Sequence, residues 1–557
     1  MPRRRTDLTS ARASFSGVVV GALVLLGASR AEAATAQDQQ LALAGAGAVK
    51  IVVRGDGWVH VGQPALVAAG LPSAVDPSKL QLFADGVEQA IEVTGNGDAT
   101  FTGDEAIEFY GTGRDTLWTD AHTYWLVAGV AGARVPVQAP AAGGAAPANF
   151  LHAERLVDHK TYLSAVLNGD KTNFFGAAVS STPTNETIAA HHLDVSAAGS
   201  AVLRVSLQGV TATSHAVDVS FNGHVLGTCT LGATADATFT FATPNVVEGD
   251  NQVSLTSEGA TDYTALESLE LDYGHTYAAD GDALLFTAPA ATRVAITGFV
   301  ATGARVVDVT DPTHPLELTV TVPVAGTARV DTSAAAGPRT LYAFTPAHVV
   351  AADSVAADAP SSWATSHDGD LLILSHASFM GAMAPLVARR AQEGWSVQLV
   401  DLQDVYDEFG GGDKTIVAIR SFVQWTRTHW RVPPRFVLLV GDATFDPRNF
   451  LGLGDFDFAP TKLIDTTTME TASDDWYVDA DLDGVPEIAI GRMPVRTVDQ
   501  ATTVVQKTLA YTGTAALPNG GLFVTDQNDP DIDFEAASAL SEAEVTGIMP
   551  TTRFARS

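Results

Sequence analysis

The spacing of apolar residues divides the chain into a long β-rich region and a shorter region where strands and helices alternate. Between residues 47 and 348, apolar and polar residues alternate over short runs that end at Gly, Asn or Asp, which is typical of strands joined by hairpins. From residue 369 onward, continuous apolar runs are followed by stretches whose apolar residues recur at helical spacing. The pattern predicts a multidomain protein, with all-β domains of the β-sandwich type followed by a doubly wound, mostly parallel α/β sheet.

Composition suggests where the β-rich region divides. We expect a small β domain over residues 47–138 and a β-sandwich region over residues 150–348, which contains either one unit or two units separated near residue 279. Segments 139–149 and 349–366 are rich in Ala and other small or polar residues and predict linkers.

The α/β region, residues 369–557, is organised around Phe436–Val440, an unbroken apolar run that ends at Gly441-Asp442. Such a run predicts a buried strand of a parallel sheet. Chemistry in open α/β sheets takes place beyond the carboxyl ends of the strands, so loop 442–449 lies where a site is expected. Further strands are predicted at 370–376, 396–401, 487–492 and 521–525, and helices at 379–393, 498–511, 534–545 and between Asp413 (as N-cap) and Pro433. After the last helix no strand pattern follows, so we expect this domain to be truncated.

The N-terminus predicts export. A basic start with three arginines is followed by the apolar run 18–26 and by Ala31-Glu32-Ala33, which together predict a signal peptide over residues 1–33 and a secreted, periplasmic or cell-surface location. The apolar run is shorter than the ~20 residues of a membrane span. Residues 34–46, rich in Ala and Gln, are expected to lack regular structure.

The net charge restricts the classes of binding partner, and the cysteine count restricts the disulfides that the chain can form. The formal net charge is −32 and no basic stripe is present, which argues against nucleic acid and against an anionic membrane surface as partners. Cys229 is the only cysteine, so the chain can form no internal disulfide.

Several motifs in the last third carry a resemblance to a known family. In order they are PLVARRAQEGWSVQLVDLQDVYDEFGGG, AIRSFVQWTRTHW, PPRFVLLVGDATFDPRN, SDDWY, DGVPEIAIGRMPVRT and VVQKTLAYT. This part of the chain resembles the gingipain family of secreted cysteine peptidases. The resemblance implies a caspase-like catalytic domain preceded by β-rich accessory domains, protein or peptide substrates, bound calcium, and a Cys–His pair in which a thiolate attacks the peptide carbonyl.

The chain departs from that family at the catalytic pair. In the family, both residues lie C-terminal to the matched motifs, whereas here all 14 histidines occur at or before His429 and no cysteine follows Cys229. We therefore expect a truncated form of a cysteine-type endopeptidase that is inactive alone. The alternative is a non-catalytic, secreted β-rich binding or adhesion protein with a degenerate peptidase domain.

Other sources of catalysis have weak support in the sequence. Cys229 lies in a predicted sandwich strand, where a buried structural cysteine is expected. Ser375-His376 ends the first α/β strand, but no G-x-S-x-G motif surrounds it, and adjacent strand residues point to opposite faces. The His191-His192 pair is expected at the surface of the sandwich. The chain contains no HExxH or CxxC zinc motif, and no glycine-rich nucleotide motif follows the central strand.

One acidic segment has the spacing of half a calcium loop. Alternating carboxylates, a glycine and an acid at the ninth position are found at Asp479, Asp481, Asp483, Gly484 and Glu487. The twelfth position is Ile490 rather than Glu, so the segment is not a complete EF-hand loop. It predicts either a structural calcium site or an acidic turn that is only solvated.

Asp474 and Asp475, in SDDWY, form a second acidic group. The resemblance places this segment beside the substrate cleft, where an acid favours Arg or Lys in the substrate through charge-assisted pairing. The other interpretation is that these acids fix a loop. Asp442 and Asp446 are expected to hold the turn after the central strand in that structural way.

Overall fold

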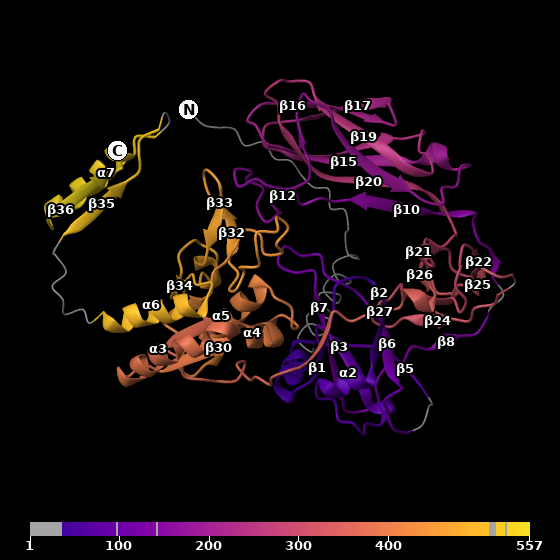
Figure 1. The fold of residues 1–557 in the computed structure, drawn as a ribbon, viewed down its shortest axis with the longest axis horizontal. Helices are drawn as coiled ribbons and strands as arrows, with labels where there is room; N and C mark the ends of the chain where they lie inside the picture. The colour runs from indigo at the N-terminus through magenta and orange to yellow at the C-terminus, as the bar shows by residue number, and fades with distance from the viewer. Residues whose placement is uncertain are drawn as a thin grey trace, which may run out of the picture.

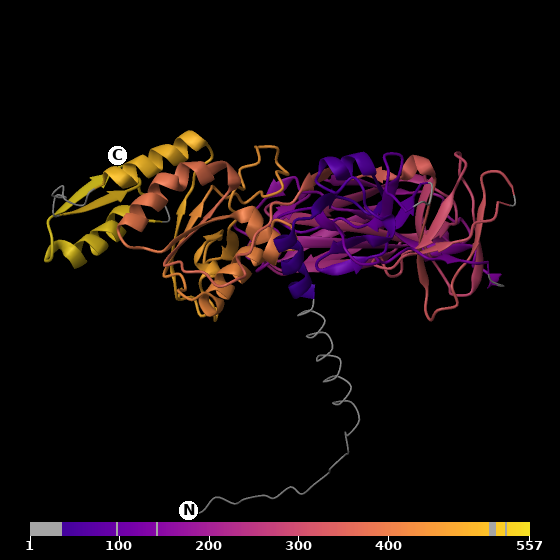
Figure 2. The same cartoon turned by 90° about the horizontal axis from the view of Figure 1, so that it is seen from below.

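The computed structural model describes residues 36–95, 99–140, 143–322, 324–511, 520–529 and 532–556. The predicted signal peptide at 1–33 lies outside these residues. The β-rich part and the α/β part lie at opposite ends of an elongated molecule (Figure 1), and the view from below shows the same division (Figure 2).

The first β domain consists of two sheets with the strand orders β28-β1-β7-β3-β4 and β27-β2-β6-β5. Its strands are β1 (Val49–Val53), β2 (Gly57–Gly62), β3 (Leu80–Ala84), β4 (Val87–Gln89), β5 (Glu92–Thr94), β6 (Ala106–Gly111) and β7 (His122–Ala128), joined by β27 (Val350–Ala351) and β28 (Ser354–Ala357). A short helix, α2 (Gln63–Ala68), follows β2. The core between the sheets contains Ile51, Leu82 and Phe109.

Two predictions for this domain are wrong. Segment 349–366 is not only a linker, because β27 pairs with β2 and β28 pairs with β1. Residues 36–46 are helical rather than irregular. Leu43 and Ala44 of that helix are buried against Phe83 and Trp125. In both cases a segment of low-complexity composition gains its structure from distant partners, which local patterns do not reveal.

The following β-sandwich packs two sheets with the orders β10-β20-β15-β18 and β14-β19-β16-β17. The strands are β10 (Asn149–Leu156), β14 (Thr184–Ala190), β15 (Val202–Gly209), β16 (His215–Phe221), β17 (His224–Leu231), β18 (Asp236–Ala242), β19 (Gly249–Ser257) and β20 (Thr264–Thr276). Two small strands, β11 (Thr161–Tyr162) and β12 (Phe174–Phe175), form a separate hairpin, and β13 (Ala178–Val179) pairs with β20. Leu203, Val219 and Leu269 belong to its core.

A further β unit with its own core follows the sandwich. Its sheets have the orders β21-β26-β23-β24-β8 and β25-β22-β9. The strands are β21 (Ala283–Ala288), β22 (Thr292–Ile296), β23 (Arg305–Asp308), β24 (Leu316–Leu318), β25 (Ala328–Asp331) and β26 (Arg339–Phe344), with β8 (Val137–Gln138) and β9 (Gly144–Ala145) from the preceding segment. Val294, Val306 and Leu341 are buried in this second core.

The α/β domain is built on a four-stranded, fully parallel sheet with the order β30-β29-β31-β34. The strands are β29 (Leu371–Ser375), β30 (Val397–Asp401), β31 (Phe436–Val440) and β34 (Ala489–Met493). A separate hairpin, β32 (Lys462–Asp465) and β33 (Glu470–Ser473), lies between β31 and β34 in the chain. The predicted central strand is confirmed as β31, which pairs with β29 on one side and β34 on the other.

Helices cover both faces of this sheet. Leu372 and Leu374 pack in one core with helices α4 (Leu402–Phe409) and α5 (Ile416–His429). Ile373, which points to the other face, packs with α3 (Met380–Gln392) and α6 (Val498–Ala510). The predicted N-cap of α5 is wrong: Thr415 caps the helix. Asp413 instead accepts hydrogen bonds from Arg114 and from the backbone of Thr123 in the first β domain.

The C-terminal residues form a small separate unit. Strand β35 (Gly521–Thr525) is followed by α7 (Phe534–Thr546) and then by β36 (Thr551–Ala555), which pairs with β35 in parallel. The expectation that no strand follows the last helix is therefore wrong, because residues 551–555 become a strand through this pairing.

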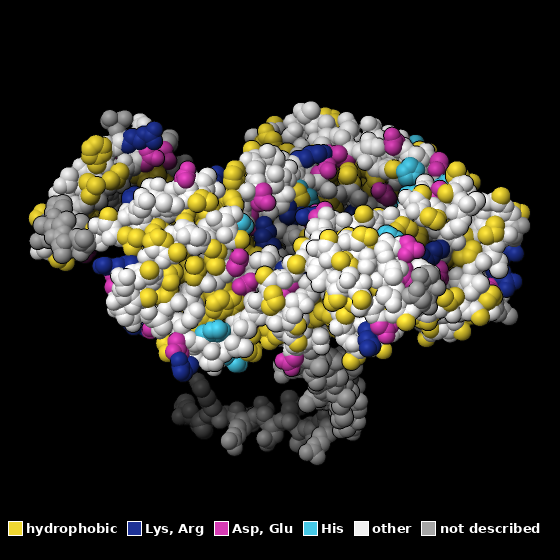
Figure 3. All heavy atoms as spheres, turned by 60° about the horizontal axis from the view of Figure 1, so that its bottom comes forward, with side chains coloured by type: hydrophobic (Ala, Val, Ile, Leu, Met, Phe, Trp, Pro, Cys, Tyr) yellow, Lys and Arg dark blue, Asp and Glu magenta, His cyan; other side chains and the backbone are white. Residues whose placement is uncertain are grey.

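Two general surface properties complete the fold. On the face shown in Figure 3, Asp and Glu side chains are dispersed over the molecule rather than gathered in one patch. In the described part of the chain, no helix combines the length and apolar character needed to cross a membrane.

Candidate functional site

The carboxyl edge of the parallel sheet is held together by one largely buried arginine. Arg492, near the end of β34, forms a bidentate ion pair with Asp474, with N–O distances of 2.8 and 2.6 Å. The same guanidinium donates to the carbonyl oxygens of Gly441 and Pro460 at 2.9 and 3.1 Å, and also to that of Ala459. Burial alone lowers the pKa of Arg492, but the ion pair with Asp474 raises it above its ordinary value. Arg492 thus fixes three loops at the edge where α/β sheets place their sites.

The two acids of SDDWY therefore lie in different environments. Asp474 is engaged by Arg492 and accepts a hydrogen bond from the Thr461 hydroxyl at 2.9 Å, which favours the loop-fixing interpretation for this residue. Asp475 begins a short 3-10 helix, Asp475–Tyr477, and is exposed. Of the two acids, Asp475 has the exposed side chain, whereas Asp474 is partly buried by its ion pair.

The turn after β31 is held by acids, as expected. Both carboxylate oxygens of Asp446 accept backbone N–H groups, from Phe450 and Leu451, at 2.8 Å each. Asp442 accepts the backbone N–H of Ala443 at 3.0 Å and pairs with Arg496 at 2.5 Å. These carboxylates are used for local structure.

The structure places neither nucleophile candidate in a reactive environment. Cys229 is fully buried in the sandwich core, and burial raises the pKa of its thiol to about 12, whereas a reactive cysteine needs a lowered pKa. The hydroxyl of Ser375 is buried and donates to the carbonyl of His376 at 3.0 Å. His376 Nδ1 accepts the backbone N–H of Ser378 at 3.2 Å, so the two side chains do not form a nucleophile–base pair.

The acidic loop after the 3-10 helix brings three predicted ligands together. One carboxylate oxygen from each of Asp479, Asp481 and Asp483 lies within 4.8 Å of the others. Asp479 is only 6% exposed, its Oδ2 accepts the N–H of Gly484 at 2.9 Å, and its Oδ1 is buried without a hydrogen-bond partner among the described residues. A buried carboxylate oxygen without a donor is unfavourable unless a cation satisfies it.

The fourth predicted ligand, Glu487, is not part of this group. Its carboxylate accepts the N–H of Ala480 at 2.7 Å and lies 3.6 Å from Arg427 of α5. Leu482, between the ligands, has φ of +61°, a left-handed conformation that is uncommon for a residue other than glycine. The loop is thus bent tightly around the three aspartates, and Glu487 stabilises its start through the hydrogen bond from Ala480.

A polar cavity of about 340 Å³ lies at the carboxyl ends of β29 and β30. It is lined by His376, Asp401, Tyr406, Lys414 and Asp457, among other residues. Lys414 Nζ is 3.1 Å from Asp457, whose side chain is almost fully buried. Burial raises the pKa of the Asp457 carboxyl even though Lys414 opposes this shift. The cavity contains charged groups but no nucleophile–base pair.

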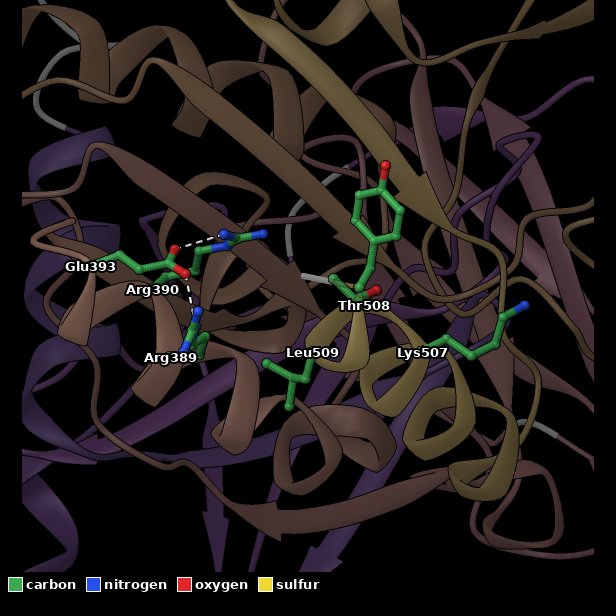
Figure 4. Close-up of a pocket in the computed structure, with 7 residues that line it drawn as sticks. Arg389, Arg390, Glu393, Lys507, Thr508 and Leu509 are labelled. Carbon is green, nitrogen blue, oxygen red and sulfur yellow. Dashed lines mark hydrogen bonds and ion pairs between the residues drawn. The ribbon is translucent and has the colours of Figure 1, made fainter. Parts of the chain in front are cut away.

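A second hollow, of about 620 Å³, lies between the C-terminal ends of α3 and α6 (Figure 4). Glu393 pairs there with Arg389 and Arg390, while Lys507 points away from them. Helices that cover a parallel sheet run back toward the amino ends of the strands, so this hollow lies at the opposite edge from Arg492. We assign no chemistry to it.

Arg492 is the residue of this edge that sequence reasoning did not single out. Its position directly after the apolar start of a strand, in IGRMP, is the one signal that could have indicated it. A charged residue at the carboxyl end of a buried parallel strand needs a partner. The identity of that partner, Asp474, follows only from the folded loops.

Comparison with known proteins supplies a family for the α/β domain. Residues 364–557 match the family described as Peptidase family C25. A search of curated proteins gives no match.

Two solved structures illustrate the range of similarity. Latent, dimeric PorU from Porphyromonas gingivalis is similar over 92% of this chain and 56% of that chain, with a TM-score of 0.63 and 18% sequence identity. This chain therefore spans just over half the length of that protein, and at such identity the likeness establishes the fold alone. The CBM36-1 domain of a xylanase from the hindgut metagenome of Trinervitermes trinervoides matches 22% of this chain and 95% of its own, at 14% identity and a TM-score of 0.16.

Proposed function

We propose that the protein serves proteolysis as part of a gingipain-type cysteine endopeptidase, because residues 364–557 match peptidase family C25. The β-rich region acts as its accessory part, and protein or peptide chains are its substrates. The observation that carries the proposal is the family match over the whole α/β region.

The parallel sheet is proposed to be part of the central sheet of a caspase-like catalytic domain. Its order, β30-β29-β31-β34, with helices on both faces, supports this assignment. Arg492 and Asp474 would then position the loops at the carboxyl edge, and exposed Asp475 would favour a basic residue in the substrate.

The 557 residues themselves are proposed to lack peptidase activity. Thiol catalysis needs a cysteine whose thiolate is stabilised and a histidine within hydrogen-bond reach. The only cysteine, Cys229, is buried with a pKa of about 12 in the sandwich. No later cysteine, and no histidine after His429, is available to the α/β domain.

We also propose that Asp479, Asp481 and Asp483 hold a structural calcium ion. Carboxylate oxygens are the ligands that Ca²⁺ prefers, and the unpartnered, buried Oδ1 of Asp479 fits such a cation. When bound, calcium would neutralise the three carboxylates and so stabilise the loop that follows Asp475. Glu487 would contribute through its hydrogen bond to Ala480 rather than as a direct ligand.

We further propose that segment 1–33 directs export of the protein. The resemblance to the gingipain family, whose peptidases are secreted, supports this. The alternative function, a non-catalytic binding or adhesion protein, has no observation that favours it over the peptidase.

The proposal is tested by reading the gene beyond the codon for Ser557. We expect an in-frame His-Gly and a cysteine, and we expect the longer product to hydrolyse Arg- or Lys-containing peptides. Replacement of that cysteine by alanine should abolish hydrolysis while leaving the fold intact. A reading frame without these residues, or a longer product without peptidase activity, would overturn the proposal.

A further inference from the structure

The first β domain meets helix α4 through a buried cluster in which two carboxylates share one ammonium group. Lys50 Nζ, on β1, lies 2.7 Å from Asp407 of α4 and 3.2 Å from Asp358, which follows β28. The side chains of Asp407 and Asp358 are 3% and 0% exposed, and that of Lys50 is 15% exposed. Two acids are thus paired with one base where water has little access. Figures 1 and 2 both show the first β domain beside the α/β domain.

Hydrogen bonds compensate these two carboxylates only in part. The Gln403 amide donates to Oδ1 of Asp407 at 2.9 Å, whereas neither oxygen of Asp358 has a hydrogen-bond partner among the described residues. Two ionised carboxylates so close together repel each other, and a proton held by one of them removes this repulsion. Burial raises the pKa of both carboxyls, although Lys50 opposes the shift. The docked domains therefore favour the form of the pair that carries one proton.

The other charged groups that α4 brings to this contact are also acids. One oxygen of Glu408 accepts the Ser361 hydroxyl and the backbone N–H of Trp363, at 2.6 and 2.8 Å. Its other oxygen accepts the N–H of Ala364 at 2.7 Å. The Trp363 indole donates to Asp404 at 2.9 Å, and burial raises the pKa of the Asp404 carboxyl. These groups add negative charge and no cation, so they do not relieve the repulsion within the pair.

A second ionic cluster at the same interface responds to pH in the same direction. Asp413 accepts the backbone N–H of Thr123 at 2.8 Å and pairs with Arg114 at 2.9 Å. Burial raises the pKa of the Asp413 carboxyl, although Arg114 opposes the shift. Burial alone would raise the pKa of Asp85, but His122 and Arg114 lower it to about 2, so Asp85 stays ionised. Loss of a proton from Asp413 or from His122 as the pH rises makes this cluster more negative.

We propose that Lys50, Asp358 and Asp407 form a pH-sensitive latch, which holds the first β domain on α4 in mildly acidic solution and releases it as the pH rises. While the domains are docked, the acid pair retains a proton. When they separate, the carboxylates meet water, where an aspartate ionises at about pH 3.9, and the proton is lost. Docking is thus fully favoured below that pH and weakens as the pH rises through the range in which the buried pair gives up its proton.

Release of the latch would widen a hollow between the two domains. The hollow has a volume of about 410 Å³ and is lined by Thr123 and Asp353 from the first β domain and by Gln403, Lys414 and Asn449 from the α/β domain. Asn449 ends the loop that follows β31, at the edge where α/β sheets place their sites. The latch would therefore control access to this edge. The inference does not depend on the proposed peptidase function, because docking is a property of the 557 residues themselves.

Hydrogen–deuterium exchange of the full 557-residue chain between pH 5 and 8 tests the latch, after correction for the intrinsic pH dependence of amide exchange. We expect the amides of residues 402–413 to lose about tenfold or more of their protection over this range, while those of β29 keep theirs. Asp358→Asn and Asp407→Asn each leave one acid for one lysine, so either variant should lose less than about twofold. Asparagine has nearly the shape of aspartate, so both variants should fold.

Asp353→Asn is the matched control, since Asp353 belongs to the same β domain but is 46% exposed and pairs with Arg54. Its residues 402–413 should lose as much protection as those of the wild type. The proposal is overturned if protection of 402–413 in the wild type does not change with pH, or if it changes equally in Asp358→Asn and Asp407→Asn. An equal loss in β29 would mean global unfolding rather than release and would overturn it as well.

Discussion

The two α/β units of this chain are built from the same elements but are held very differently. In the first, helices cover both faces of the sheet, and Ile373 and Leu374 are fully buried. The second, β35–α7–β36, has one helix for two strands. The structure describes every residue of α7, and none of them is buried. Leu522, Val524 and Phe554 are 67–68% exposed.

The first unit is also tied to the β domain before it. Lys50 forms ion pairs with Asp407 of α4 and with Asp358, at 2.7 and 3.2 Å, and the Trp125 indole donates to the carbonyl of Gly411 at 2.6 Å. Local stability within one protein follows the amount of apolar burial and of internal bonding. The first unit should therefore be a rigid support for the carboxyl edge, and the second should open far more readily.

The largest effect is expected at the centre of the first unit. Arg492→Ala leaves the Asp474 carboxylate partly buried without its partner, and breaking such a pair costs about 3–5 kcal/mol of unfolding free energy. Urea unfolding monitored on this unit measures the loss. Arg431→Ala is the control, since Arg431 pairs with Asp368 while 78% exposed, and its loss should change the free energy of unfolding far less. Similar losses in both variants would contradict the role of Arg492.

A matched pair of leucines compares the two units directly. Leu374→Ala in β29 removes a fully buried side chain and should cost about 2–5 kcal/mol. Leu522→Ala in β35 truncates a side chain that is 67% exposed and should change the free energy of unfolding by less than about 0.5 kcal/mol. A large loss for Leu522→Ala would show that a partner covers that strand in solution.

Calcium should increase the difference in stability between the two units, because the loop with Asp479, Asp481 and Asp483 belongs to the first unit. At 100 times its dissociation constant, the ion should stabilise that unit by about 2.7 kcal/mol. Asp481→Asn should abolish the rise in melting temperature, whereas Asp526→Asn, in the second unit, should leave it unchanged. Identical melting temperatures in chelator and in millimolar calcium would remove the calcium proposal.

A smaller effect is expected in the pH dependence of the free energy of unfolding, at the contact between Asp407 of α4 and Lys50 of the first β domain. Burial raises the pKa of the Asp407 carboxyl to about 7, although Lys50 opposes the shift. The folded state therefore retains a proton that the unfolded state releases near pH 3.8, so this contribution to stability is complete below that pH and is lost as pH rises through about 7. Asp407→Asn should reduce the decrease in unfolding free energy with rising pH, whereas Glu258→Gln, at an exposed position, should leave that decrease unchanged. An unchanged slope in Asp407→Asn, measured by unfolding between pH 4 and 8, would contradict this.

The parts that could be predicted from sequence are those with local signals. The apolar run Phe436–Val440 predicts β31, and the spacing of Asp479, Asp481 and Asp483 predicts their convergence. Residues 551–555 carry no strand pattern and become β36 only by pairing with β35.

Sites assembled from distant segments could not be predicted. Lys50 and Asp407 are 357 residues apart in the chain, and their ion pair forms only when the first β domain packs against α4. Asp413 was a reasonable N-cap by local rules, yet Arg114 of another domain engages it. Long-range pairing overrides local preference in each of these cases.

The central proposal is that the 557 residues alone lack peptidase activity, because their one cysteine, Cys229, is buried in the sandwich core. The direct measurement is the turnover of Arg- and Lys-containing peptides by the purified 557-residue protein, with and without a thiol alkylator. We predict no turnover above that of the Cys229→Ala variant. Turnover that the alkylator abolishes would contradict the account.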